Sequence, residues 1–226
     1  MYQKVKENKY ILKMVVLGDV GVGKTNIIRR ILKQEYNKQE ETVGVEFAFI
    51  DISDIDPDNP DIKLTIQIWD TCNYIFILKF LSLAGAERYR AITTNHIRNA
   101  DGAFLVYDIC NQNSFNAINF WLNIIKKTIG ENVVIYLIGN KADLIEKSKK
   151  NRKVSKEEAI EFSKTNHFQG FCECSALKNV NINEAFISFY KSLYKKNKGI
   201  LDQKTNEKII YLNKLKEKHS NDKCCS

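Results

Sequence analysis

Apolar residues recur with two different periods along this chain, and these periods predict strands and helices in alternation. Residues 10–17 form an almost continuous apolar run typical of a buried strand, and residues 24–33 carry apolar side chains at helical spacing. Segment 54–61, which contains both prolines, predicts a hairpin loop between two alternating strands. This order favours an α/β fold with a mainly parallel sheet that helices cover on both faces. Strands are also expected at 43–53, 64–68, 103–107, 133–138 and 168–172, and helices at 113–129, 155–166 and 182–194.

The length and composition are those of one globular domain. The chain has 226 residues, of which 44% are hydrophobic and 27% are charged, and a chain of this kind can bury one core. Its apolar runs are shorter than the roughly 20 residues of a membrane-spanning helix. Lysines interrupt residues 1–13, which argues against a signal peptide. The six cysteines have no metal-ligand spacing, which favours a reducing, intracellular setting.

The positive charge is concentrated near the end of the chain. The formal net charge is +8, and residues 195–226 hold nine lysines against four acidic residues. We interpret residues 1–9 as an extension, 10–197 as the folded domain and 198–226 as a basic tail. A basic tail that ends in cysteines is typical of a protein that binds a membrane surface, and it argues against nucleic acid as a partner.

A glycine-rich segment between the first strand and the first helix matches the phosphate-binding pattern G-x-x-x-x-G-K-[ST]. It runs from Gly18 to Thr25. Its glycines let backbone N–H groups turn toward phosphate oxygens, and the helix N-terminus adds positive potential. Lys24 is expected to reach the β- and γ-phosphates of a nucleoside triphosphate, and the Thr25 hydroxyl to ligate Mg²⁺. The other residues expected to bind phosphate here are Asp19, Val20, Gly21, Val22 and Gly23.

Two later segments select the base. An Asn-Lys-Ala-Asp sequence follows the predicted strand at 133–138, where a base pocket can form at the carboxyl end of the sheet. The Asp143 carboxylate can accept hydrogen bonds from the N1–H and the exocyclic amine of guanine, a donor pair that adenine lacks. Lys141 can lie along the base plane, and the Ala176 N–H can donate to the guanine oxygen. This order of motifs indicates a guanine nucleotide and opposes the alternative of a P-loop kinase or ATPase. The residues expected to bind guanine are Asn140, Lys141, Asp143, Ser175, Ala176 and Leu177.

With these motifs the chain resembles the small GTPases of the Ras superfamily, and within them the Rab family, over residues 10–195 and at its end. The resemblance implies the P-loop GTPase fold: a six-stranded, mainly parallel sheet with one antiparallel strand and helices on both faces. It also implies a switch that binds GTP or GDP with Mg²⁺ and recruits effectors in vesicular trafficking. The segments that carry it are Val43–Phe47, Ile68–Thr71, Leu105–Ile109 and Cys224–Ser226, with Arg88–Thr93 and Cys174–Leu177 most similar to the recycling-endosome branch.

The resemblance gives roles to four further residues. Thr42 is expected to close onto Mg²⁺ and the γ-phosphate, and Asp70 to hold a Mg²⁺-bound water. The Gly85 N–H is expected to sense the γ-phosphate, and Tyr36 to stack on the base. Loss of the γ-phosphate would release both switch segments and change which partners bind.

Two substitutions depart from the family pattern and predict slow GTP hydrolysis. Val20 stands where the family usually has a small residue, and its branched side chain would crowd an arginine from an activating protein. Ala86 replaces the glutamine that orients the attacking water, and a methyl group cannot hydrogen-bond that water. We therefore expect a slow GTPase that depends on an activating protein. The alternative is a GTP-binding trafficking scaffold with little or no hydrolysis.

Residues 72–83 interrupt the second switch with an apolar insert, CNYIFILKFLSL. A lineage-specific packing element is one explanation, and an error in the gene model is the one we favour. Every residue of the insert can be written with A/T-rich codons, Cys72-Asn73 can conceal a GTAA splice donor, and Leu83-Ala84 can conceal a TAG acceptor. A cDNA sequence decides between the two explanations.

The terminal Cys224-Cys225-Ser226 is similar to Rab tails that carry two geranylgeranyl groups. The resemblance implies prenylation of Cys224 and Cys225, anchorage on the cytoplasmic face of an intracellular membrane, and a cytosolic pool. The implied partners are effectors, a nucleotide exchange factor, a GTPase-activating protein, a prenylation escort and a GDP-dissociation inhibitor. The other cysteines, the histidines and Trp121 are interpreted as packing or surface residues, and Trp69 as a packing residue that can also contact effectors.

Overall fold

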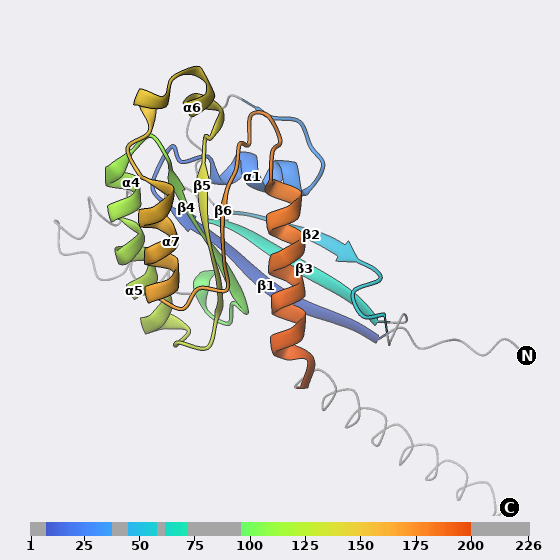
Figure 1. The fold of residues 1–226 in the computed structure, drawn as a ribbon. Coiled ribbons are helices and arrows are strands. Elements are labelled where there is room, and N and C mark those ends of the chain that lie inside the picture. Colours follow the sequence, from blue (N-terminus) through green and yellow to red (C-terminus); the bar gives the residue numbers. More distant parts are fainter. Residues whose placement is uncertain (1–7, 38–44, 58–61, 72–95, 200–226) are drawn as a thin grey trace, which may run out of the picture.

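The computed structural model describes residues 8–37, 45–57, 62–71 and 96–199, which form one twisted sheet with helices packed against it (Figure 1). The sheet has six strands in the order β2-β3-β1-β4-β5-β6. The β2–β3 pair is antiparallel and all other neighbouring pairs are parallel, so the predicted fold class is confirmed. The strands are β1 (Asn8–Gly18), β2 (Val45–Ile52), β3 (Ile62–Thr71), β4 (Gly102–Asp108), β5 (Val134–Asn140) and β6 (Gly170–Glu173).

Helices cover both faces of the sheet, as the alternating pattern predicts. The helix of residues 182–199, orange to red in Figure 1, shares one core with the first helix, and α5 and α7 belong to the other core. Further helices are α1 (Lys24–Ile31), α4 (Gln112–Asn116), α5 (Ile118–Thr128), α6 (Asp143–Lys147), the 3₁₀ helix η1 (Lys149–Asn151) and α7 (Lys156–Thr165).

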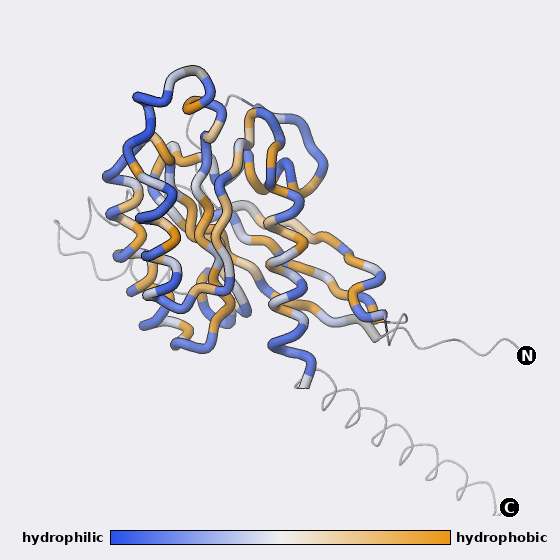
Figure 2. Tube along the Cα trace, viewed as in Figure 1, coloured by the Kyte–Doolittle hydropathy of each residue, from blue (hydrophilic) through white to orange (hydrophobic). Residues whose placement is uncertain are grey.

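Strand β1 shows how the sheet divides the core in two. Met14 and Val16 belong to the cluster that contains α1 and the helix of residues 182–199, whereas Val15 and Leu17 belong to the cluster that contains α5. All four side chains are fully buried. Each contributes about 1.5–3 kcal/mol by leaving water. Figure 2 shows the same division, with strongly apolar central strands and helices that are polar on their outer sides.

The prediction of one continuous helix at 113–129 is wrong in one respect: the structure divides this segment at Ala117 into α4 and α5. Two donors, the N–H groups of Phe120 and Trp121, share the Ala117 carbonyl, at 3.0 and 3.2 Å. This tightens one turn, but the backbone at Ala117 remains right-handed helical. The apolar spacing therefore continues across the break, which explains why periodicity alone does not reveal it.

The parallel strands place their carboxyl ends at one edge of the sheet, and the predicted site residues Asp70 and Asn140 lie there. Gly18 ends β1, Asp70 lies near the end of β3, Asp108 ends β4 and Asn140 ends β5. Such an edge is where ligands bind in open α/β sheets. Within the stretches that the structure describes, none of the helices is both long and apolar enough to cross a membrane.

Candidate nucleotide-binding site

The loop between β1 and α1 has the backbone conformation that a phosphate cradle requires. Gly21 and Gly23 have φ angles of +74° and +95°, in the left-handed region that favours glycine. Gly23 directly precedes α1, so the first N–H groups of this helix face the loop. The glycines therefore let the chain curl around the helix N-terminus, where the backbone dipoles favour an anion.

Lys24 is held inside this loop. Only 5% of its surface is exposed, and its Nζ donates hydrogen bonds to the Gly18 and Asp19 carbonyl oxygens, each at 2.9 Å. A buried ammonium is costly unless it has such partners. The positive charge is thus fixed at the phosphate cradle.

Thr25 and Asp70 provide a pair of oxygen ligands beside the cradle. The Thr25 Oγ1 hydroxyl donates to Asp70 Oδ2 at 2.6 Å, although the two residues are 45 positions apart. Asp70 is almost fully buried, at 2% exposure. Hydroxyl and carboxylate oxygens are the hard ligands that Mg²⁺ prefers, so this donor set fits the predicted ion.

Asn140 connects the phosphate loop with the predicted guanine loop. Its Nδ2 donates to the Val22 carbonyl at 2.8 Å, and its Oδ1 accepts the Ala176 N–H at 3.1 Å. The Cys174 thiol also points at Oδ1, at 3.6 Å. The asparagine therefore fixes the two loops relative to each other. Its bond to Ala176 also uses the N–H group that is predicted to donate to the guanine oxygen.

Asp143 and Lys141 are oriented by separate partners. The Ser175 hydroxyl donates to Asp143 Oδ1 at 2.6 Å, and both residues are buried. Lys141 Nζ lies 2.8 Å from Asp108 Oδ2, and the Lys141 backbone has a left-handed φ of +71°. Asp108 has no role predicted from the sequence, although it lies in a segment that carries the family resemblance.

Comparison with known proteins identifies what this arrangement belongs to. The Ras family model matches residues 13–195. The chain belongs to the Ras family of small GTPases. It is 40% identical over 190 residues to GTP-binding protein ypt3 of Schizosaccharomyces pombe (84% of this chain, 78% of that protein). It is 39% identical over 196 residues to Ras-related protein Rab11B of Nicotiana tabacum (86% and 80%). It is 35% identical over 190 residues to Ras-related protein Rab-11C of Dictyostelium discoideum (84% and 75%).

Tyr36 of this small GTPase lies just after α1. Its side chain is half-buried and packs against the core cluster on the α1 face of the sheet. The Asn26 side chain anchors the next residue, because it donates to the Asn37 carbonyl at 2.9 Å and accepts the Asn37 N–H at 3.0 Å. Stacking of Tyr36 on guanine stays a prediction. Thr42, Gly85, Ala86, Cys224, Cys225 and the insert at 72–83 lie outside the described residues.

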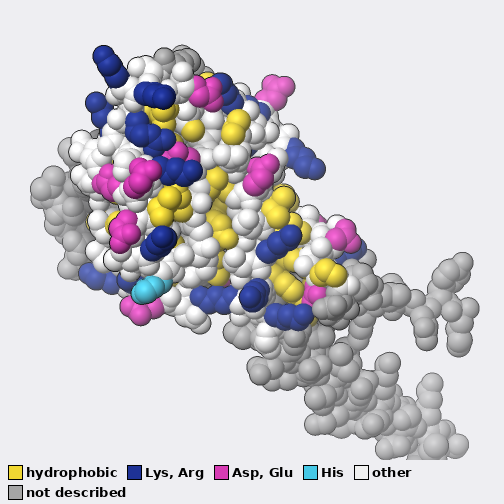
Figure 3. All heavy atoms as spheres, viewed as in Figure 1, with side chains coloured by type: hydrophobic (Ala, Val, Ile, Leu, Met, Phe, Trp, Pro, Cys, Tyr) yellow, Lys and Arg dark blue, Asp and Glu magenta, His cyan; other side chains and the backbone are white. Residues whose placement is uncertain are grey.

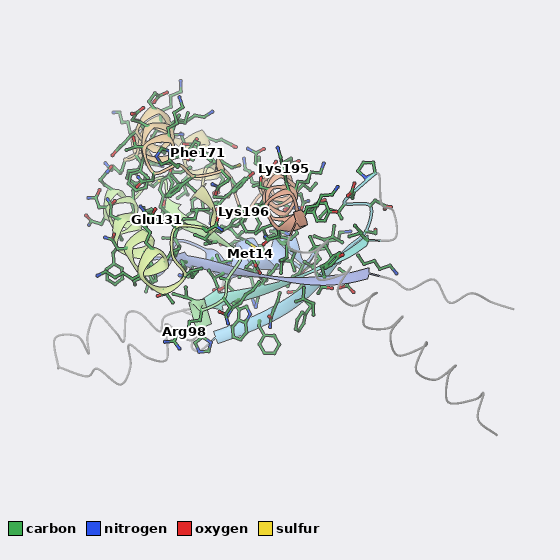
Figure 4. The ribbon with its side chains drawn as sticks, turned by 90° about the horizontal axis from the view of Figure 1, so that it is seen from below. Met14, Arg98, Glu131, Phe171, Lys195 and Lys196 are labelled. Atoms are coloured by element: carbon green, nitrogen blue, oxygen red, sulfur yellow. The ribbon has the colours of Figure 1, made fainter. Side chains whose placement is uncertain are left out.

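Two exposed aromatic residues, Phe47 and Phe49, lie beside the half-buried Trp69 on the small GTPase, and we call these three residues the aromatic surface. Phe47 and Phe49 are 59% and 54% exposed, and the Phe47 ring stacks on Trp69 with 5.5 Å between centroids. Lys13 Nζ lies 4.6 Å from the Trp69 ring and donates to the Arg98 carbonyl at 2.9 Å. Figure 4 shows Arg98 on the side of the strands opposite to Lys195, which lies on the helix of residues 182–199.

The cysteines in the described part of the chain are free thiols in ordinary packing positions. They are Cys110, Cys172 and Cys174. Burial raises the pKa of Cys172 to about 11 and the pKa of Cys174 further still. Among the residues described, no group of three or more His, Cys, Asp or Glu side chains could hold a metal ion.

Proposed function

We propose that this small GTPase is a membrane-anchored switch that binds GTP or GDP with Mg²⁺ and recruits effectors in membrane trafficking. The observation that carries the proposal is that the Asn140 side chain forms hydrogen bonds with both the phosphate loop and the guanine loop. The family match and the relatives named Rab11B, Rab-11C and GTP-binding protein ypt3 support it.

In this proposal each part of the nucleotide has its own protein contacts. The backbone N–H groups from Asp19 to Thr25 and the Lys24 ammonium hold the β- and γ-phosphates. The Asp143 carboxylate, oriented by the Ser175 hydroxyl at 2.6 Å, accepts the N1–H and the exocyclic amine of guanine. Thr25 binds Mg²⁺ directly, and Asp70 through a water, with Thr42 as a further ligand. Mg²⁺ would neutralise negative charge on the phosphates.

The first experimental test of this proposal is whether the protein binds GDP in preference to ADP. GDP binding to the full chain, measured by calorimetry with Mg²⁺, is expected to be tight, and ADP at equal concentration is expected not to compete. Asp143→Asn replaces one acceptor oxygen with a donor and is expected to weaken GDP binding at least tenfold, since about 1.4 kcal/mol corresponds to a factor of ten. Equal competition by ADP would contradict guanine selection.

We further propose that intrinsic GTP hydrolysis is slow. Val20 is 36% exposed beside the phosphate cradle, where its branched side chain would meet an arginine from an activating protein. Ala86 carries no group that orients water. A single-turnover assay of the wild type and of Ala86→Gln tests this: the wild type is expected to hydrolyse GTP more slowly than about 10⁻⁴ s⁻¹, and the glutamine variant faster.

An activating protein distinguishes the slow GTPase from the alternative scaffold. Addition of a Rab-activating protein that supplies its own glutamine is expected to accelerate turnover, and the acceleration is expected to grow in Val20→Ser. A wild-type rate that equals that of glutamine-bearing relatives contradicts slow hydrolysis. If no activating protein changes the rate, the scaffold with little or no hydrolysis is the better description.

The aromatic surface is the proposed contact for effectors. Phe47 pairs in register with Trp69 on β3, the strand that also carries Asp70. An effector on this surface would therefore touch the strands that lead to both switches. The Phe47→Ala variant is expected to lose GTP-dependent partners from a pull-down while retaining GDP binding.

Membrane attachment is proposed to come from prenylation of Cys224 and Cys225 together with the lysines of the tail. Figure 3 shows both basic and acidic side chains on one face of the folded domain, with several basic side chains gathered along its lower edge. Two geranylgeranyl groups are what stable anchoring requires, and each lysine near an anionic leaflet adds about 1 kcal/mol. Replacing both cysteines with serine is expected to leave the protein in the cytosolic fraction. The exchange factor, the prenylation escort and the GDP-dissociation inhibitor belong to the same proposal.

A further inference from the structure

Arg30 connects the phosphate-binding helix α1 to the guanine loop, which lies far away in the sequence. It lies in the last turn of α1, and its Nε donates to the Ala176 carbonyl at 2.9 Å. Its Nη2 donates to the neighbouring Leu177 carbonyl at 3.0 Å. The two acceptors are 146 and 147 residues away in sequence, so only the fold brings these groups together.

The geometry of these bonds needs an arginine. A guanidinium is a rigid plane whose N–H groups diverge in a fork, so it can hold two adjacent carbonyl groups at a fixed spacing. A lysine ammonium is a single point of charge and cannot hold both in the same way. Ala176 is only 3% exposed. Loss of the arginine would leave its buried carbonyl without this donor, which would lower the free energy of unfolding.

The held peptides lie next to the group that is predicted to read the base. The Ala176 N–H belongs to the peptide just before the first carbonyl that Arg30 binds. The Ser175 side chain is fixed from the other side by Asp143. The loop is therefore clamped on both sides of the Ala176 N–H, with the serine contact on one side and the arginine fork on the other.

We propose that Arg30 is a positioning residue for guanine recognition: it holds the peptide next to the Ala176 N–H, a group that donates to Asn140 Oδ1 at 3.1 Å and would also face the carbonyl oxygen of the base. This inference rests on the proposed binding of guanine nucleotides. Arg30 also donates to the Gln34 carbonyl at 3.5 Å, so the same side chain ties the segment after α1 to the guanine loop. Its effect is specific to the base, because the phosphate contacts come from the opposite end of α1.

The experiment compares GDP with ADP in the full chain with Mg²⁺. ADP has an amine where guanine has the carbonyl oxygen, so it uses the phosphate contacts without the Ala176 contact. Arg30→Met is expected to weaken GDP binding about tenfold and to leave the weak ADP binding, measured by calorimetry at high nucleotide concentration, unchanged. Arg30→Lys is expected to fall between the wild type and Arg30→Met. Lys33→Met is the matched control, since it removes one exposed positive charge after α1.

Different results would overturn the positioning role of Arg30 and the proposed binding of guanine nucleotides. Equal losses of GDP and ADP affinity in Arg30→Met would show that the arginine only stabilises the fold. GDP affinity within twofold of the wild type in both Arg30 variants would overturn the positioning role. If Arg30→Met does not fold, Arg30→Lys supplies the same comparison of GDP with ADP. A wild type that binds no guanine nucleotide would overturn the proposed function itself.

Discussion

Replacing Gly23 with alanine tests the contact between the phosphate loop and the guanine loop. Gly23 has a φ of +95°, and a Cβ added there would lie closer to Asn140 Nδ2 than 3.0 Å, a separation below which real Cβ contacts essentially do not occur. The same Nδ2 donates to the Val22 carbonyl at 2.8 Å. Gly21 provides the matched control, because its φ of +74° is also left-handed but a Cβ there would meet nothing within 4 Å.

The two alanine variants share one cost and differ in another. A left-handed backbone costs an alanine about 1 kcal/mol at either position. In Gly23→Ala the Asn140 amide must also move, which breaks its bond to the Val22 carbonyl and adds about 1–3 kcal/mol. We expect the free energy of unfolding to fall by about 1 kcal/mol in Gly21→Ala and by about 2–4 kcal/mol in Gly23→Ala.

Urea denaturation of the full chain, in EDTA so that no Mg²⁺-bound nucleotide contributes, measures both losses. A double-mutant cycle then adds Asn140→Ala to each variant. Without the Asn140 amide, Gly23→Ala is expected to cost no more than Gly21→Ala. The reasoning is refuted if Gly23→Ala is no worse than Gly21→Ala in the wild-type background, or if the difference persists after Asn140 is removed.

Three further predictions concern the core and its titratable groups. Gly102→Ala places a Cβ 2.6–2.9 Å from the Phe189 and Leu193 side chains, so its free energy of unfolding in urea is expected to fall by about 1–3 kcal/mol. The control Gly199→Ala, where a Cβ meets nothing within 4 Å, is expected to change little. Equal free energies of unfolding in the two variants would contradict this prediction. Burial raises the pKa of Cys172 to about 11, so its alkylation by iodoacetamide, followed by mass spectrometry, is expected to increase with pH around 11, and a midpoint near 9 would contradict this. Burial and the nearby Lys13 lower the pKa of His96, so the neutral imidazole is favoured in the folded state. The resulting stability is present above the ordinary pKa of 6.5 and is lost as the pH falls below it; an NMR titration that gives a pKa above 6.5 would disagree.

Elements with strong local patterns could be predicted from the sequence. The apolar runs of β1, β4 and β5 predict buried strands because both faces of a central parallel strand are covered. The phosphate loop is equally local, since its glycines and Lys24 stand at fixed spacing between a strand and a helix. The positive φ angles of Gly21 and Gly23 agree with that interpretation.

Contacts between distant segments could not be predicted in the same way. Arg30 reaches the Ala176 carbonyl only because α1 packs beside the loop after β6, and nothing in its neighbouring residues indicates this. The ion pair of Lys141 with Asp108 depends on the pairing of β4 with β5. The break at Ala117 is invisible to periodicity, because the turn there is tightened without a change in which side chains face the core.

Nucleotide release from purified protein tests the central claim most directly. The full chain is denatured, and the released nucleotides are separated by chromatography. Folded protein from which the nucleotide has been removed is then titrated with GDP and ADP in the presence of Mg²⁺. The account predicts close to one guanine nucleotide per chain and uptake of GDP but not of ADP at equal concentration. Folded protein that releases no guanine nucleotide and takes none up would contradict it.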